Sequence, residues 1–257
     1  MSITRDDALN WIKAVASVIG ENSAYLTELD AAIGDADHGA NMDRGFKAVM
    51  NKLPEISDKD IGTVFKTIGM TLISTVGGAG GPLYGTFFLQ AGMKTAGKME
   101  LNLAEWTDAL DAALSGVIMR GKAELGDKTM VDALTPAVAA LKQSIQERQP
   151  INKALELSAD AAKKGMEATI PLVARKGRAS YLGERSAGHQ DPGSTSSYLI
   201  LQAAANTWKE IVRTYMEVGY QGILSIENED PILPGEVGVE RAAYVLKNVR
   251  SELLGSA

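Results

Sequence analysis

The sequence predicts an all-α domain of about eight helices over most of its length. Apolar residues recur every three to four positions in segment after segment, and alanine is abundant in those segments. The alternation typical of a half-buried strand is nearly absent. Helices of this kind bury their apolar stripes against one another, so a helical bundle is the expected architecture.

The first predicted helix covers the stretch TRDDALNWIKAVASVIGENSAYLTEL, which begins at Thr4. We expect Thr4 to cap it, because acidic residues follow in the first turn. The apolar residues of this helix keep the spacing of one buried stripe: Ala8, Trp11, Ile12, Val15, Val18 and Ile19. Similar stripes predict seven more helices, at about 42–53, 58–75, 82–97, 103–120, 131–146, 151–173 and 193–215.

The character of the sequence changes near its end, so we predict two parts: a helical domain at 1–212 and a C-terminal extension at 213–257. In the extension, Gly222 to Ile226 is a short β-like run, and an amphipathic helix is expected after it. Such a β-α unit has no sheet to join in an all-α domain, which makes this segment look appended.

Composition excludes several classes of protein. The formal net charge of −6 provides no basic footprint, so neither nucleic acid nor an anionic membrane is predicted as a partner. The absence of cysteine excludes disulfides and thiolate metal sites. The N-terminus lacks a signal-peptide pattern and no apolar run reaches membrane-spanning length, so we expect a cytoplasmic protein.

An acidic loop, LDAAIGDADHGANM, is the first candidate site. Asp30, Asp35 and Asp37 can converge because Gly34 and Gly39 allow the backbone to turn sharply. Mg²⁺ prefers oxygen ligands and is usually held by a few carboxylates together with phosphate oxygens. The spacing does not fit the calcium-loop pattern, and a solvated loop with capping aspartates is the favoured interpretation of the cluster when it is taken alone.

A second loop, STVGGAGGPLYG, places four glycines just before Pro82, which is expected at a first helical position. Free backbone N–H groups at a helix N-terminus bind phosphate, although the sequence is not that of a P-loop. A flexible turn, or glycines that allow close helix packing, is the alternative interpretation.

Two further loops are polar. In RGKAELGDKTMVDAL, Gly121 ends one helix and Asp127 or Thr129 caps the next, which on its own is an ordinary connection. The segment ARKGRASYLGERSAGHQDPGSTS is unusually long for a loop of a compact domain, and its Arg178 could clamp a phosphate or simply be solvated. Taken together, carboxylates, a glycine-rich helix start and an arginine loop are the components of phosphoryl transfer.

These four segments, in this order, resemble the L subunit of bacterial dihydroxyacetone kinase, from the N-terminus to about residue 212. The resemblance implies an eight-helix antiparallel barrel with a nucleotide, ADP or ATP, bound at one end. It implies two Mg²⁺ ions held by Asp30, Asp35 and Asp37. It further implies phosphate contacts from His38, Gly39, Ala40, Asn41, Ala79 and Gly80, with Arg178 nearby, and a nucleoside framed by Gly121, Met130, Asp191, Pro192 and Gly193.

The chain departs from the family at Gly80, where serine is usual, so a hydroxyl contact to phosphate is lost while the backbone N–H donor stays. No residue here is expected to act as a general base; catalysis is expected to rest on positioning and electrostatics.

The resemblance also implies partners. A separate K subunit holds dihydroxyacetone covalently, and a phosphotransferase-system M subunit recharges bound ADP. An ATP-dependent kinase of dihydroxyacetone or erythrulose is the alternative, as is a nucleotide-binding regulatory module. A structural metal-binding helical protein is a third alternative.

The extension resembles a different family. GYQGILSIENEDP followed by GVERAAYVLKNV is similar to the last strand and helix of a xylose-isomerase-like TIM barrel, in which the residue matching Glu227 can bind metal. The other ligands and strand–helix units are missing, so we predict a fusion remnant without isomerase activity. An unconstrained extension is the alternative interpretation.

Overall fold

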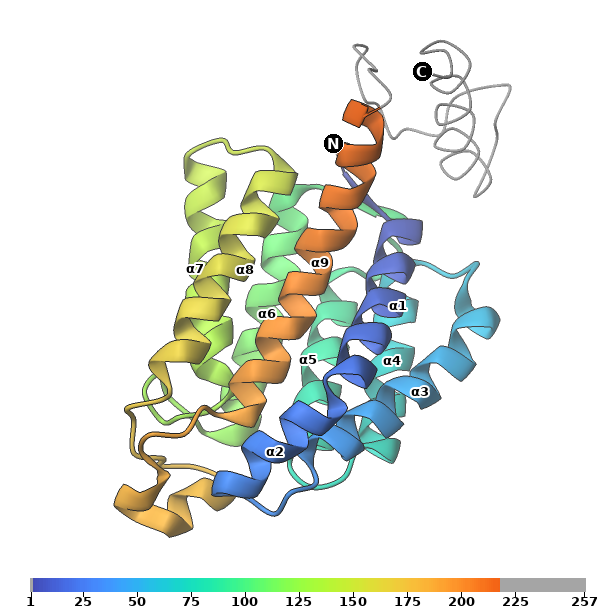
Figure 1. Ribbon diagram of the computed structural model, residues 1–257. Coiled ribbons are helices and arrows are strands. Elements are labelled where there is room, and N and C mark those ends of the chain that lie inside the picture. The colour runs from blue at the N-terminus through green and yellow to red at the C-terminus, as the bar shows by residue number, and fades with distance from the viewer. Residues whose placement is uncertain (1, 218–257) are drawn as a thin grey trace, which may run out of the picture.

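The computed structural model describes residues 2–217 (Figure 1). Its α-helices are α1 (Arg5–Glu21), α2 (Ser23–Ile33), α3 (His38–Ile56), α4 (Ile61–Thr75), α5 (Gly80–Lys94), α6 (Leu103–Gly121), α7 (Met130–Gln146), α8 (Ile151–Ala168) and α9 (Pro192–Glu217). A 3-10 helix, η1 (Arg178–Ser186), and two antiparallel strands, β1 (Ile3–Thr4) and β2 (Glu100–Leu101), complete the described elements. The all-α prediction is confirmed.

Eight of the helices form a closed ring. From α3 to α9 each helix packs against the next one in the chain, α1 packs against α3, and α9 returns to pack against α1. Neighbouring helices run in opposite directions, so the ring is an antiparallel barrel, as Figure 1 shows. The short helix α2 lies at one end of the ring, where it contacts α3, α9 and η1.

The first predicted helix is in fact two helices. Thr4 caps α1 as expected, in a capping box with Asp7. The chain then breaks at Asn22, whose backbone N–H and side-chain amide both donate to the carbonyl of Val18. Asparagine favours such local hydrogen bonds over a continued helix, and α2 leaves in a new direction.

Other predicted boundaries shift by a few residues. The third helix begins at His38 rather than near 42, so His38 and Asn41 belong to its first turn. Helix α5 begins at Gly80, two residues before Pro82. The chain after Ala168 is no longer α-helical, and the long polar loop contains η1. Helix α9 continues to Glu217, past the predicted boundary at 212; the predicted strand and second helix lie outside the described residues.

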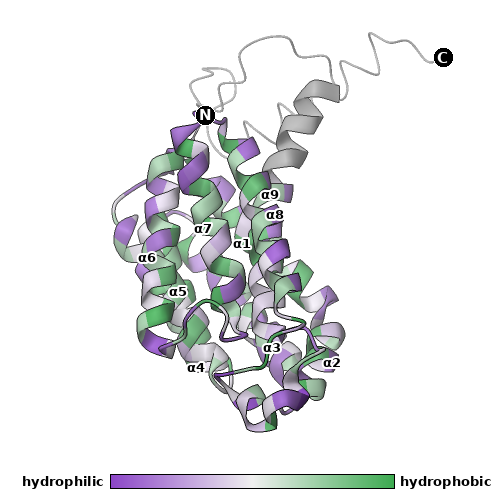
Figure 2. Ribbon diagram, turned by 90° about the vertical axis from the view of Figure 1, so that its left-hand side faces the viewer, coloured by the Kyte–Doolittle hydropathy of each residue, from purple (hydrophilic) through white to green (hydrophobic). Residues whose placement is uncertain are grey.

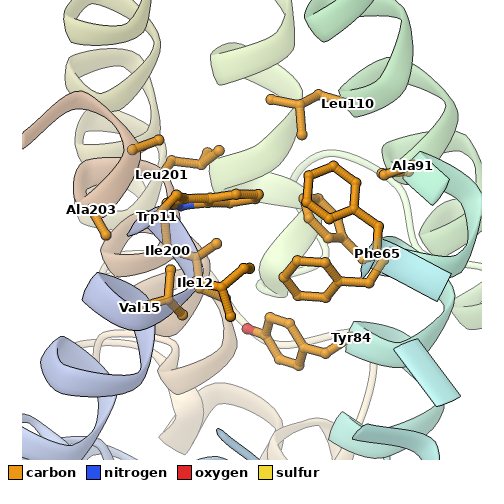
Figure 3. Packing of buried hydrophobic residues seen from close by; sticks show 14 of the residues in the cluster. Trp11, Ile12, Val15, Phe65, Tyr84, Ala91, Leu110, Ile200, Leu201 and Ala203 are labelled. Atoms are coloured by element: carbon orange, nitrogen blue, oxygen red, sulfur yellow. Dashed lines mark hydrogen bonds between the residues drawn. The ribbon is translucent and has the colours of Figure 1, made fainter. Parts of the chain in front are cut away.

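The core of the barrel is apolar and aromatic. Trp11 of α1 lies at its centre, with ring centroids 5.7 Å from Phe65, 5.8 Å from Phe88 and 5.1 Å from Trp106. Its indole Nε1 donates to the Ile200 carbonyl at 2.8 Å, which ties α1 to α9 (Figure 3). Hydrophilic and hydrophobic residues interchange along the helices in Figure 2, as expected for helices with one buried face. Among the described helices, none has the length and apolar character needed to cross a bilayer.

Helices α4 and α5 approach unusually closely because glycines line their contact. A Cβ on Gly69 would lie 2.7 Å from the Gly85 carbonyl oxygen, and a Cβ on Gly92 would lie 2.7 Å from the Gly62 carbonyl oxygen. The loop between these two helices, residues 76–79, is therefore held by two tightly packed backbones.

We expect Gly69→Ala to destabilise the fold by about 2 kcal/mol, because the added methyl group meets backbone atoms that cannot move aside. Gly20→Ala is the matched control: it also adds a methyl group to a helix, but one that meets only the Asp43 carboxylate, at 3.3 Å. Alanine is the better helix former, so this control is expected to be neutral or stabilising. Urea unfolding measures both; equal stabilities would contradict the packing account.

Candidate nucleotide and metal site

The four loops that carry the predicted site residues meet at one end of the barrel, here called the site end. They are residues 34–37, 76–79, 122–129 and 169–191, and the alternation of helix directions brings all four there (Figure 1). Residues of all four segments line one pocket there.

The three aspartates of the acidic loop converge. Asp30 lies in α2, and Asp35 and Asp37 follow in the loop to α3. One carboxylate oxygen from each of the three lies within 4.8 Å of the others. Asp30 is buried, while Asp35 is exposed. An all-oxygen set of three carboxylates, partly open to solvent, fits a hard cation such as Mg²⁺.

The geometry of this loop depends on Asp30. Its Oδ2 accepts the backbone N–H of Asp37 at 2.9 Å and that of His38 at 3.1 Å, at the start of α3. A Cβ on Gly34 would lie 2.0 Å from Asp30 Oδ1, so only glycine fits beside this carboxylate. Ala36 takes a positive φ of 61°, which is uncommon outside glycine and shows how tightly the loop turns.

An arginine lies over the acidic loop. Arg178, the first residue of η1, pairs with Asp35 through an Nη2–Oδ2 distance of 3.0 Å. Because its side chain is 63% exposed, this ion pair adds little to stability and leaves the guanidinium free to exchange partners. Lys176 lies close by, in the lining of the same pocket.

Opposite the acidic loop, the N-terminus of α5 presents unpaired donors. Within the described part of the chain, no backbone N–H from Gly77 to Gly81 donates a hydrogen bond, and Ala79 makes no side-chain cap. Gly78 has a φ of +61°, which favours glycine. Free N–H groups and the positive end of a helix dipole suit an anion such as phosphate. A Cβ at Gly80 would meet only Val76, at 3.2 Å, so the usual serine would need only a small adjustment.

One pocket at the site end gathers most of the predicted residues. Those that line it are Asp30, Asp35, Asp37, His38, Asn41, Ala79, Gly80, Met130, Arg178, Asp191, Pro192 and Gly193. Three predicted residues do not line it: Gly39, Ala40 and Gly121. Gly39 instead packs against α2, where an added Cβ would lie 1.9 Å from the Ser23 carbonyl oxygen. Gly121 ends α6 beside Leu83, which itself lines the pocket.

A polar network in the wall of the pocket includes Tyr84, which the sequence analysis did not identify. His38 Nε2 lies 2.8 Å from Ser196 Oγ, and the Tyr84 hydroxyl lies 2.6 Å from the same oxygen. The Tyr84 hydroxyl also donates to the Gly193 carbonyl at 2.9 Å. Burial lowers the pKa of His38 and raises that of Tyr84, so both side chains stay neutral. The network joins α3, α5 and α9 in the pocket wall, and nothing in the sequence distinguishes Tyr84 from a core aromatic.

Lys128 is the second residue that the sequence analysis missed. Its side chain is buried, and its ammonium donates to the carbonyls of Thr169 at 2.7 Å and Leu172 at 3.2 Å, and to that of His189. It thereby joins the 122–129 connection to both ends of the 169–191 loop. Burial lowers its pKa, and the carboxylates of Asp191 and Asp132 oppose that shift.

Asp191 caps α9 from within the pocket lining. Its Oδ2 accepts the backbone N–H of Ser194, and its backbone N–H donates to Thr169 Oγ1 at 3.1 Å. Burial raises the pKa of Asp191 to about 7, with Asp132 adding to the rise and Lys128 opposing it.

A raised carboxyl pKa makes stability depend on pH. The folded state binds the Asp191 proton more tightly than the unfolded state, so this contribution is full below pH about 4 and is lost as pH rises to about 7. We expect Asp191→Asn, which cannot titrate, to flatten the fall in melting temperature over this range. Asp7, whose pKa burial raises to about 6, adds a smaller fall that stays in both proteins. Identical pH profiles would contradict the assignment.

Comparison with known proteins places the chain in a family. The DAK2 domain model matches residues 32–206. The chain is 50% identical over 210 residues to the ADP-binding subunit DhaL of the PEP-dependent dihydroxyacetone kinase of Escherichia coli, covering 82% of this chain and 100% of that protein. The corresponding subunit of the PTS-dependent kinase of Lactococcus lactis is 41% identical, covering 78% of this chain and 96% of its own length.

Comparison with solved structures also matches this chain to a dihydroxyacetone kinase. The native dihydroxyacetone kinase of C. freundii matches with a TM-score of 0.62 and 27% identity, over 78% of this chain and 34% of that one. The same kinase in complex with AMP-PNP and Mg²⁺ matches with a TM-score of 0.59 and 28% identity, over 77% of this chain and 33% of that one. The chain thus spans about a third of each solved kinase chain. It belongs to the DAK2 domain family, together with the L subunits of dihydroxyacetone kinase.

Proposed function

We propose that this chain is the nucleotide-carrying L subunit of a dihydroxyacetone kinase, which passes a phosphoryl group to dihydroxyacetone held by a separate K subunit. One observation supports this most directly: three convergent carboxylates and the free N–H groups of residues 77–81 face the same pocket. Cation ligands and anion donors in one pocket suit a Mg²⁺–nucleotide complex.

Each side of the pocket has its own role in this proposal. Asp30, Asp35 and Asp37 hold two Mg²⁺ ions, which neutralise phosphate charge when bound. His38 and Asn41, at the start of α3, and Ala79 and Gly80, at the start of α5, contact the phosphates. Arg178 exchanges Asp35 for the phosphate. The role of the protein is to position these groups and to supply a fixed electrostatic environment.

The nucleoside lies on the other side of the same pocket, against Met130 and the turn Asp191–Pro192–Gly193. Gly39, Ala40 and Gly121 do not line the pocket, so we propose that they act by shaping the backbone around it. The hydroxyl of Tyr84 and the ammonium of Lys128, both from the pocket wall, hold these segments in place.

We propose phosphoenolpyruvate as the ultimate phosphoryl donor, with a phosphotransferase-system M subunit recharging resident ADP. The relatives named as PEP- or PTS-dependent are 41–50% identical and match over nearly their whole length. Relatives named as erythrulose kinases are 31% and 30% identical, and the chain covers only about a third of each. The cytoplasmic location stays a prediction.

Reconstitution tests the proposal. The chain is combined with a K subunit and dihydroxyacetone, and product is measured with either ATP alone or phosphoenolpyruvate and the phosphotransferase proteins, including an M subunit. We expect product only in the second mixture, with ADP staying bound to the chain during turnover. Product from ATP alone would assign the alternative donor. Failure to bind any nucleotide in the presence of Mg²⁺ would overturn the proposed function.

A further inference from the structure

Arg44 does not itself line the pocket, yet it holds a residue that does. Its Nη2 donates to Asn41 Oδ1 at 2.6 Å, and its Nε donates to the carbonyl of Thr75 at 2.9 Å. Asn41 lies in the first turn of α3, and Thr75 is the last residue of α4. One guanidinium therefore joins two of the segments that surround the proposed phosphate position.

The contact fixes the orientation of the Asn41 amide. A guanidinium has only donors, so the atom that it meets at 2.6 Å must be the amide oxygen. The amide nitrogen then points the other way. Within the described residues, Asn41 Nδ2 donates to no protein group, and Asn41 lines the pocket. Its two N–H groups are therefore available to a ligand bound in the pocket.

The amide is also held from its other side. A Cβ on Gly77 would lie 2.9 Å from Asn41 Oδ1 and 3.0 Å from Asn41 Nδ2, so only a bare α-carbon fits against the amide plane. The close approach of α3 to the end of α4 depends on a second glycine, since a Cβ on Gly45 would lie 2.2 Å from Val76 Cγ2. This proximity brings the Thr75 carbonyl within reach of Arg44.

We propose that Arg44 is a positioning residue for nucleotide phosphate: anchored to the Thr75 carbonyl, it orients the Asn41 amide so that Nδ2 donates into the pocket. The inference rests on the proposed function. Arg44 is exposed, so its charge is screened by water, and its effect comes from geometry rather than from attraction at a distance.

Calorimetric titration with Mg²⁺–ADP and with adenosine tests the proposal in four variants: Asn41→Ala, Arg44→Met, the double variant and Arg44→Lys. We expect Asn41→Ala to weaken Mg²⁺–ADP binding about tenfold, the effect of one good hydrogen bond, and Arg44→Met to weaken it by about three- to tenfold. The double variant should bind no more weakly than Asn41→Ala, because Arg44 acts through Asn41. Arg44→Lys should fall between wild type and Arg44→Met, and adenosine affinity should not change.

Lys47→Met is the matched control, since it removes a cation that lies on the same helix and pairs with Asp43 at 2.7 Å. The side-chain NH₂ signals of Asn41, identified by their loss in Asn41→Ala, should move in ligand-free Arg44→Met and stay in Lys47→Met. Independent losses that multiply in the double variant, an equal loss of adenosine affinity, or unmoved NH₂ signals would each overturn the inference. A wild-type chain that binds no Mg²⁺–ADP would instead overturn the proposed function itself.

Discussion

Asp30→Asn is expected to abolish magnesium-dependent ADP binding, with a loss in affinity of at least about 100-fold. Asp30 Oδ2 accepts the N–H groups of both Asp37 and His38. An asparagine must turn its oxygen toward these donors, which points its NH₂ group at the position where the cation needs a lone pair. Calorimetric titration of ADP with and without Mg²⁺ measures the loss.

Asp43→Asn controls for removal of a carboxylate from the same part of the chain. Asp43 lies on α3 and pairs with Lys47, and it is not part of the pocket lining. It should bind Mg²⁺–ADP like the wild type, and circular dichroism should show both variants folded. If Asp30→Asn keeps affinity within about threefold of the wild type, Asp30 is not a metal ligand.

Lys128→Met is expected to cost about 3 kcal/mol or more of folding stability. The change keeps an unbranched side chain of similar length and removes the ammonium. The carbonyls of Thr169, Leu172 and His189 then lose a charged donor inside the protein, and the carboxylate of Asp191 loses a nearby cation. Urea unfolding measures the change in the free energy of unfolding.

Lys122→Met separates this effect from the loss of a lysine in a strained turn. Both lysines lie in the connection from α6 to α7 and both have positive φ, 49° at Lys122 and 63° at Lys128. Lys122 is exposed, and its side chain makes no hydrogen bond or ion pair within residues 2–217. We expect this control to stay within about 0.5 kcal/mol of the wild type. Equal effects of the two changes would show that the ammonium contacts contribute nothing.

The helices were predictable because each one carries its own apolar stripe, as Trp11, Ile12 and Val15 do in α1. The break at Asn22 was not predictable from the sequence, because the apolar periodicity continues through it and only a local hydrogen bond to Val18 ends the helix. Closure of the ring between α1 and α9 depends on contacts such as that of Trp11 with Ile200, which are far apart in sequence. Periodicity says nothing about such contacts.

The site residues likewise divide into those that the local sequence reveals and those that depend on contacts distant in sequence. Asp30, Asp35 and Asp37 carry their chemistry in the sequence itself, as charges at close spacing. Tyr84 and Lys128 acquire theirs only from burial among groups of other helices, and a lone tyrosine or lysine carries no sign of that. Gly121 ends α6 beside Leu83 but does not itself line the pocket, a spatial detail that a resemblance between sequences does not give.

The barrel contains an even number of helices, and this number determines at which end of the barrel the chain enters and leaves it. In a closed ring whose helices alternate in direction, an even number of helices places the start of the first helix and the end of the last one at the same rim. Here Arg5 begins α1 and Glu217 ends α9 on the rim opposite the site end (Figure 1). Joining another module at either terminus therefore begins away from the pocket. A fold of this kind matches about one third of a longer kinase chain, that of C. freundii.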